Sequence, residues 1–268
     1  MSPYRHPPLV LALLEVRHPE AGVLTPGELN AIKQTLIQHV PLTRTDAVSE
    51  MVVEIVAGQP QAMAHTHPAH RFLSRDSRTQ VTFQPTAITV ETAAYQDWAW
   101  FSGIVRDVLT TRQDVAPVDG VDRVGLRYVD EIRIPPDVGQ SDPPVWDAWM
   151  TPQLLAPRFD GLRCAQQQCA VQYELDGPGH TLTVRYGALE APSQVPRTFS
   201  ARAAAEVPTD HFFLVDTDAA WTVLVGDETP ELDVDQVLDT ADQLHAPSKK
   251  VFEAAISQLL RTEVLDRA

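Results

Sequence analysis

Three histidines lie close together in the stretch HTHPAH, as His65, His67 and His70. Neutral imidazole nitrogen is a good ligand for zinc and other borderline metals, so this spacing predicts a possible divalent-metal site. The surrounding sequence is rich in Pro, Ala and Gln, which is typical of a loop, and no neighbouring acid is available to orient the rings. The alternative interpretation is a solvated loop without a specific metal.

A second pair of chemically useful side chains is Asp216 and Asp218, in the stretch VDTDAAW. Alternation along a strand places both carboxylates on one face. Two neighbouring carboxylates can raise one pKa for acid–base work, or they can hold a divalent cation through oxygen. The alternative is a strand end whose carboxylates face water.

A third set consists of charged residues on two similar strands, LVLALLEVRHP at Leu9–Pro19 and VGLRYVDEIRIP at Val124–Pro135. Their charged side chains are expected to share the face opposite the apolar side, where arginine forks are well shaped to clamp an anionic ligand. Cross-strand ion pairing within a sheet is the competing interpretation. The candidate ligand-binding residues are Glu15, Arg17, Arg127, Tyr128, Glu131 and Arg133.

Familiar catalytic motifs are missing from the sequence. It contains no GxSxG, Walker-type phosphate loop, GxGxxG or HExxH element. Their absence disfavours the common hydrolases, nucleotide enzymes and zinc proteases. It leaves open an enzyme of unfamiliar type.

The composition is that of an acidic globular protein. The 268 residues carry a net charge of -15, which disfavours binding to nucleic acid because phosphate contacts depend on Lys and Arg. The apolar run near the N-terminus is shorter than a membrane span and is followed by Glu15 and Arg17, so a buried strand is expected there and no membrane association. The two cysteines, Cys164 and Cys169, would point to opposite faces of a strand, and a reducing cytoplasm is the simplest location.

The positions of these residues depend on a repeated series of elements. In the first half, the patterns predict a strand at 9–17, a helix beginning at Thr25 with a capping box, strands at 50–57, 78–85 and 87–95, and a helix at 95–113. In the second half, they predict a strand at 124–135, a short helix at 142–150, strands at 162–175, 180–189 and 211–222, and a helical region from Val234 to about Asp266. Pro247 should kink or divide that last region, with Ser248 as a new cap.

Each half therefore shows the order strand, helix, three strands, helix. The sequence predicts an α+β fold built from two copies of one unit, with curved antiparallel sheets and the longer helices on one face. The expected units are residues 1–116 and 117–268, sharing one core, with a single compact domain as the alternative.

The chain resembles an uncharacterised prokaryotic family described as sporadically distributed. The resemblance covers nearly the whole chain, and the stretches that carry it are Pro8-Leu9 through Glu15-Val16-Arg17, Leu126-Arg127-Tyr128, Val215 to Trp221, Leu244-His245 and Phe252-Glu253. The family usually has an acidic residue at the position of Leu11, an Asn at that of Asp130 and an aliphatic residue at that of Thr217. The resemblance implies a fold and no particular activity.

Strong structural patterns without a catalytic motif predict a cytoplasmic, non-catalytic binding or interaction protein. A sheet face or a groove between the two repeats would bind a protein or small-molecule partner. The alternative is a metal-dependent enzyme or metal-binding accessory protein that uses His65, His67 and His70, or Asp216 and Asp218.

Overall fold

The computed structural model describes residues 4–56, 59–138, 144–162, 164–191 and 210–267. The side chains of 46–56, 59–68, 191 and 210 lie outside this description. The strands are β1 (Leu9–Arg17), β2 (Leu42–Val56), β3 (Gln59–Leu73), β4 (Thr79–Gln84), β5 (Ala87–Thr92), β6 (Arg123–Ile132), β7 (Cys169–Glu174), β8 (His180–Ala191) and β9 (Asp210–Thr222). The helices are α1 (Pro26–Thr35), α2 (Trp98–Val115), α3 (Val234–Ala255) and α4 (Gln258–Leu260), and single turns lie at Trp146–Ala148, Pro152–Leu154 and Arg261–Leu265.

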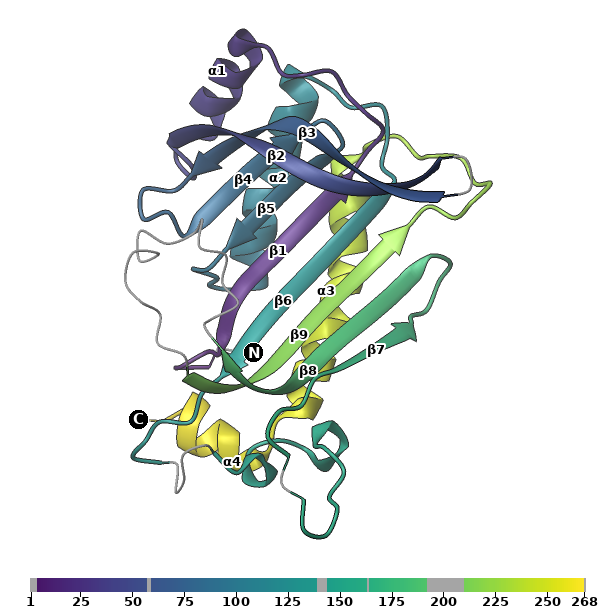
Figure 1. Ribbon diagram of the computed structural model, residues 1–268. Coiled ribbons are helices and arrows are strands. Elements are labelled where there is room, and N and C mark those ends of the chain that lie inside the picture. The colour runs from purple at the N-terminus through teal and green to yellow at the C-terminus, as the bar shows by residue number, and fades with distance from the viewer. Residues whose placement is uncertain (1–3, 57–58, 139–143, 163, 192–209, 268) are drawn as a thin grey trace.

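The strands form one antiparallel sheet in the order β2-β3-β4-β5-β1-β6-β9-β8-β7. The first strand of each half, β1 and β6, lie side by side in the middle, with Ala12 opposite Tyr128. From this pair outward, the first half continues β5-β4-β3-β2 and the second continues β9-β8-β7. The fold is therefore α+β, as predicted, but the expected separate sheets are joined into a single sheet (Figure 1).

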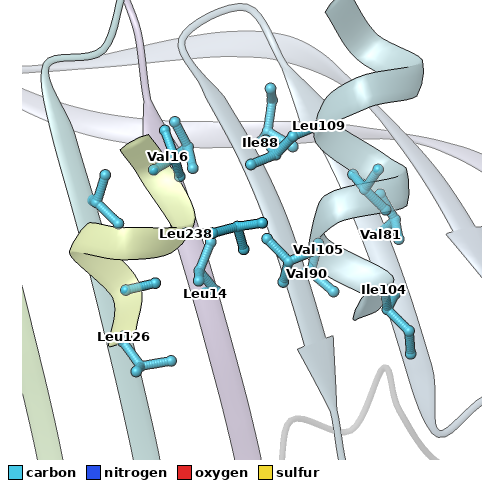
Figure 2. Packing of buried hydrophobic residues seen from close by; sticks show 14 of the residues in the cluster. Leu14, Val16, Val81, Ile88, Val90, Ile104, Val105, Leu109, Leu126 and Leu238 are labelled. Atoms are coloured by element: carbon cyan, nitrogen blue, oxygen red, sulfur yellow. The ribbon is translucent and has the colours of Figure 1, made fainter. Parts of the chain in front are cut away.

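The two long helices, α2 and α3, cover one face of this sheet (Figure 1). Alternation along the strands sends Leu14, Val90 and Leu126 toward the helices, where they contact side chains such as Val105 and Leu238 (Figure 2). Burial of this apolar cluster removes a large hydrophobic area from water and fixes the face that each strand presents. The alternate residues of the same strands consequently point to the opposite face.

The predicted start of α1 is confirmed in detail. The hydroxyl oxygen of Thr25 accepts from the backbone N–H of Glu28, and the Glu28 carboxylate accepts from the backbone N–H of Thr25 at 2.7 Å. Pro26 occupies the first turn, where its missing N–H costs no helical hydrogen bond. Ile32 and Leu36 then bury themselves in the main core.

The prediction of a loop around the three histidines is wrong. Residues 59–73 form β3, which pairs with β2 without a register break, and β2 itself begins at Leu42 rather than at residue 50. Only His70–Leu73 of β3 pair with β4 in the described residues, so Pro60 and Pro68 can direct their nitrogens toward an unpaired edge. Pairing with β2 therefore outweighs the local loop signals of the two prolines.

The second half contains less regular structure than predicted. The expected helix at 142–150 is a single turn at Trp146–Ala148, because Pro152 restricts Thr151 to extended backbone and prevents continuation. The expected strand at 162–175 is confined to Cys169–Glu174, the residues that pair with β8.

Of the two outcomes predicted at Pro247, a kink or a division into two helices, the division is wrong. Helix α3 continues through Pro247 to Ala255, and the Ser248 hydroxyl donates to the carbonyl of Leu244 at 3.1 Å instead of capping a new helix. Burial of Ala241 and Leu244 before the proline, and of Ala255 after it, stabilises the helix on both sides of Pro247. The actual division follows Ala255, where Ser257 caps α4.

Candidate functional site

A cluster of ion-paired arginines lies on the sheet face opposite α2 and α3, in the centre of the sheet. No described helix covers this face, which is turned toward the viewer in Figure 1. Four neighbouring strands, β1, β6, β9 and β8, supply its residues. We call this set the arginine cluster: Glu15, Arg17, Arg123, Arg127, Arg185, Asp216 and Asp218.

Arg127 and Asp216 form the best-defined pair in the arginine cluster. The guanidinium donates from Nε to Oδ1 and from Nη2 to Oδ2 of Asp216, both at 2.8 Å. This forked geometry is the strongest arrangement that a guanidinium and a carboxylate can adopt. Arg185 lies opposite Asp216 in the β8–β9 pair, with its Nη1 at 3.5 Å from Oδ2 of Asp216 and 3.9 Å from Oδ2 of Asp218.

Glu15 joins two arginines that would otherwise repel each other. Arg17 and Arg123 are directly opposite in the β1–β6 pair. Oε1 of Glu15 accepts from Nε of Arg17 at 2.7 Å and from Nη1 of Arg123 at 3.0 Å. Arg123 also donates to Oδ1 of Asp218 at 3.2 Å, which connects the two ends of the arginine cluster.

Within the arginine cluster, the carboxylate of Asp216 lies beneath the guanidinium groups that contact it. The side chain of Asp216 is 4% exposed, whereas those of Arg127 and Arg185 are 41% and 43% exposed. Four arginines against three carboxylates leave one positive charge, in a chain whose net charge is -15. The exposed guanidinium groups of Arg127 and Arg185 can therefore offer N–H donors to an anion while the buried carboxylate of Asp216 holds them in place.

Glu131 and Arg133, two other predicted site residues, form an ion pair with each other. Nη2 of Arg133 donates to Oε2 of Glu131 at 2.9 Å, and the guanidinium lies 4.7 Å from the ring centroid of Phe212. Glu131 lies on β6 four residues after Arg127, so alternation puts these two side chains on the same face of the sheet.

Tyr128, the last predicted ligand-binding residue, faces the helices instead of the arginine cluster. It is 7% exposed, and its hydroxyl is hydrogen-bonded to Nδ1 of His245 at 2.9 Å. The His245 ring stacks on Trp98 with centroids 4.8 Å apart, and burial lowers the pKa of His245. Burial also raises the pKa of Tyr128. These contacts join α2, α3 and β6 inside the core.

Of the three predicted metal-binding histidines, only His70 has a described side chain, and those of His65 and His67 lie outside the described residues. His70 is 9% exposed and shares a pocket with Arg112, whose positive charge disfavours a metal cation there. Among the described residues, no group of three or more His, Cys, Asp or Glu is placed to hold a metal ion.

Asp216 and Asp218, the other predicted metal or acid–base pair, do share one face as expected. Their carboxylates contact the guanidinium groups of Arg123, Arg127 and Arg185. This arrangement favours ion pairing over binding of a divalent cation.

Two further acids with perturbed pKa values escaped the sequence analysis. Burial raises the pKa of Glu91, on β5, to about 7, and Oε1 of Glu91 accepts from Nε2 of Gln80 at 2.7 Å. Burial, with the charge of Asp216, raises the pKa of Asp130 to about 8. Arg123 and Arg185 were also missed, although the alternation of Thr181, Thr183 and Arg185 signals a polar strand face.

The free cysteines and the helices add two general observations. Neither Cys164 nor Cys169 forms a disulfide, and Cys164 is exposed outside β7. In the described residues, no helix combines the length and apolar character that crossing a lipid bilayer requires.

Comparison with protein-family models finds no match, and a search of curated proteins finds none either.

Proposed function

We propose that this chain is a non-catalytic binding protein that uses the sheet face carrying the arginine cluster to hold an anionic group of a protein or small-molecule partner. The observation that supports this function most directly is the exposure of Arg127 and Arg185 above a buried Asp216. A guanidinium held from below by a carboxylate keeps its orientation, which lowers the entropy lost when a ligand binds above it.

Arg185 is the residue best placed to contact such a partner. Its Nη1 lies at 3.5 and 3.9 Å from the carboxylates of Asp216 and Asp218, longer than the 2.8 Å bonds of Arg127. Its five N–H donors are therefore weakly engaged, and the planar fork suits a carboxylate or phosphate. Arg127 has a mainly positioning role, because it is bonded to Asp216 through two donors.

We further propose that the two halves of the chain arose by duplication and that the protein belongs to the sporadically distributed prokaryotic family that it resembles. The matching outward order of strands from β1 and β6 supports the first proposal. Contacts between residues of separate resembling stretches, Arg127 with Asp216 and Tyr128 with His245, support the second. A cytoplasmic location agrees with the two reduced cysteines.

Binding can be tested by titrating the purified chain with hexaglutamate and with citrate at low and high salt, using calorimetry. Hexalysine serves as the ligand control, and Arg158→Ala serves as the variant control because Arg158 is 79% exposed and pairs with Asp147 outside the cluster. We expect Arg185→Ala to weaken binding of at least one anionic probe about tenfold, the effect of one charge-assisted hydrogen bond. Arg158→Ala should leave it unchanged.

Equal weakening by both substitutions, or no binding of either anionic probe, would count against the proposed function. Catalysis is the remaining test. If the purified chain turns over a substrate and Arg185→Ala abolishes that turnover, the non-catalytic assignment must be abandoned.

A further inference from the structure

A small pocket at the opposite end of α2 from Trp98 gathers buried nitrogen atoms that have no partner. It is an open hollow lined by Gly22, Val23, Leu24, His70, Phe83, Gln84, Pro85 and Arg112, and the space of about 240 Å³ that no protein atom fills there includes solvent outside its mouth. Its residues come from the segment before α1, from β3, from the end of β4 and its turn, and from α2. None of them belongs to the arginine cluster.

Arg112 is the unusual residue of this pocket. It is 3% exposed, and its Nη1 is buried without a hydrogen-bond partner among the described residues. Burial lowers the pKa of Arg112, whereas the charge of Glu28 raises it. A guanidinium at this depth is costly unless it is paired, because arginine stays charged in proteins.

Glu28, the nearest acid that affects Arg112, is not a buried counterion. Its carboxylate accepts from the backbone N–H and the hydroxyl of Thr25, at 2.7 and 2.8 Å, and these contacts are exposed. This carboxylate is therefore committed to capping α1. The charge of Arg112 is left without a hydrogen-bonded carboxylate in the described residues.

Two histidines add further unsatisfied nitrogens near the same guanidinium. Neither Nδ1 nor Nε2 of His70 has a partner in the described residues, although His70 is 9% exposed and lines the pocket. His18 is 2% exposed; its Nδ1 is hydrogen-bonded to the carbonyl of Pro19 at 2.8 Å, while its Nε2 has no described partner. His18 lies near enough to Arg112 for that charge to lower its pKa.

We propose that this pocket binds a compact anion, either inorganic phosphate or the phosphate group of a larger molecule that extends into solvent. Arg112 supplies the charge and a free N–H donor, His70 supplies a second donor, and Leu24 and Phe83 form an apolar wall that strengthens both interactions. An anion here would satisfy the nitrogen atoms that the protein itself leaves unpaired. A metal cation is disfavoured by the same guanidinium.

The test compares three proteins in thermal unfolding and calorimetry, with inorganic phosphate and O-phosphoserine as probes at constant ionic strength. Arg112→Met removes the buried charge and keeps an unbranched side chain of similar length. Arg106→Met is the matched control, because Arg106 lies on the same helix but is 53% exposed and pairs with Asp235. The control is needed because phosphate also stabilises proteins non-specifically by exclusion from their surface.

We expect at least one probe to bind the parent and Arg106→Met equally and to bind Arg112→Met about ten- to a hundredfold more weakly, as expected for loss of a charge-assisted hydrogen bond. Binding of O-phosphoserine without inorganic phosphate would identify a phosphate ester as the ligand class; the reverse result would identify the free ion. Equal responses in all three proteins, or no binding of either probe to the parent, would overturn the proposal.

If Arg112→Met does not fold, His70→Gln decides the question by the same titration. Loss of the imidazole should weaken binding several-fold at pH 6, with the Arg106→Met response again as the reference. Unchanged affinity in His70→Gln would then overturn the proposed site. Because Arg185 lies on the other face of the sheet, failure here would leave the proposed function of the arginine cluster unaffected.

Discussion

Arg127 lies directly opposite Asp218 in the β6–β9 pair, yet it directs its fork to Asp216, two residues away on the same face. Because Arg127 contacts Asp216, the Oδ1 atom of Asp218 accepts a hydrogen bond from Arg123 instead, and this contact is also diagonal across the two strands. The arginine cluster is therefore a connected network rather than a row of isolated cross-strand pairs, and removal of one member should affect the others.

Arg127→Ala should lower the free energy of unfolding by roughly 2 kcal/mol, because it leaves the buried carboxylate of Asp216 with Arg185 as its only described ion-pair partner. The value is below that for a fully buried pair since Arg127 is 41% exposed. Urea unfolding measures the change. The double variant Arg127→Ala/Asp216→Ala should be less destabilised than the sum of the single variants; simple additivity would show that the two residues do not interact.

Gly125→Ala should displace the guanidinium of Arg123. A Cβ atom at position 125 would lie 2.1 Å from Nη1 of Arg123, which no real contact permits. Because the obstructing group ends a flexible side chain, we expect a loss of about 1 kcal/mol, similar to that of an ion pair in a network, rather than unfolding. Gly103→Ala is the control, since nothing lies within 4 Å of its added Cβ. If the effect of Gly125→Ala persists in an Arg123→Ala background, the clash is not its cause.

Asp130→Asn should stabilise the protein at alkaline pH. The carboxyl has a pKa of about 8 in the folded chain against 3.8 when unfolded, so its contribution to stability is full below about pH 4 and is lost as pH rises to about 8. An amide does not ionise and should remove this loss, for a gain of a few kcal/mol at pH 8.5 and of about 1.5 kcal/mol at pH 5. Unfolding at both pH values measures it. An equal effect at both would show that Asp130 is charged throughout.

Glu91→Gln should also stabilise the protein, but over a lower pH range than Asp130→Asn. The pKa of Glu91 is about 7 in the folded protein against 4.5 unfolded, so its stabilising contribution is present below about pH 4.5 and lost as pH rises through 7. As the pH rises from 5 to 8, the free energy of unfolding of the variant should increase by roughly 2 kcal/mol relative to that of the parent. Direct titration of the Glu91 carboxyl by NMR would provide a second check, and a pKa near 4.5 would contradict this interpretation.

Tyr128→Phe should cost about 1 kcal/mol, the usual value of a buried hydrogen bond, because it removes the contact with His245. Anionic ligand binding to the arginine cluster should remain unchanged, since the hydroxyl faces α3. A large loss of that binding in a folded Tyr128→Phe variant would contradict the separation of the two faces.

The sequence predicted the central strands well because their local pattern agrees with their environment. Val16 and Leu14 alternate with Glu15 and Arg17, and burial against the helices preserves that alternation. Residues 59–73 could not be recognised as a strand, because β3 depends on pairing with β2 rather than on its own residue types.

The arginine cluster could not be predicted as one site, because it too depends on contacts between strands that are distant in the sequence. Arg127, Asp216 and Asp218 were each identified from local pattern, but they belonged to separate hypotheses. Their contact depends on β9 lying beside β6, a register that no local signal in either strand specifies. The pocket around Arg112 could not be predicted from the sequence for a different reason. A single arginine in the last turn of a helix usually reaches solvent, so its burial has no local signal.

The position of β1 has a consequence for synthesis on the ribosome. β1 is hydrogen-bonded to β5 on one side and to β6 on the other, and β6 follows α2 in the chain. While Arg123–Ile132 are still within the exit tunnel, a folded first half would present β1 as a bare edge, open to pairing with a neighbouring nascent chain. Emergence of β6 should close that edge, after which β6 is the exposed edge until β9 emerges and pairs with it.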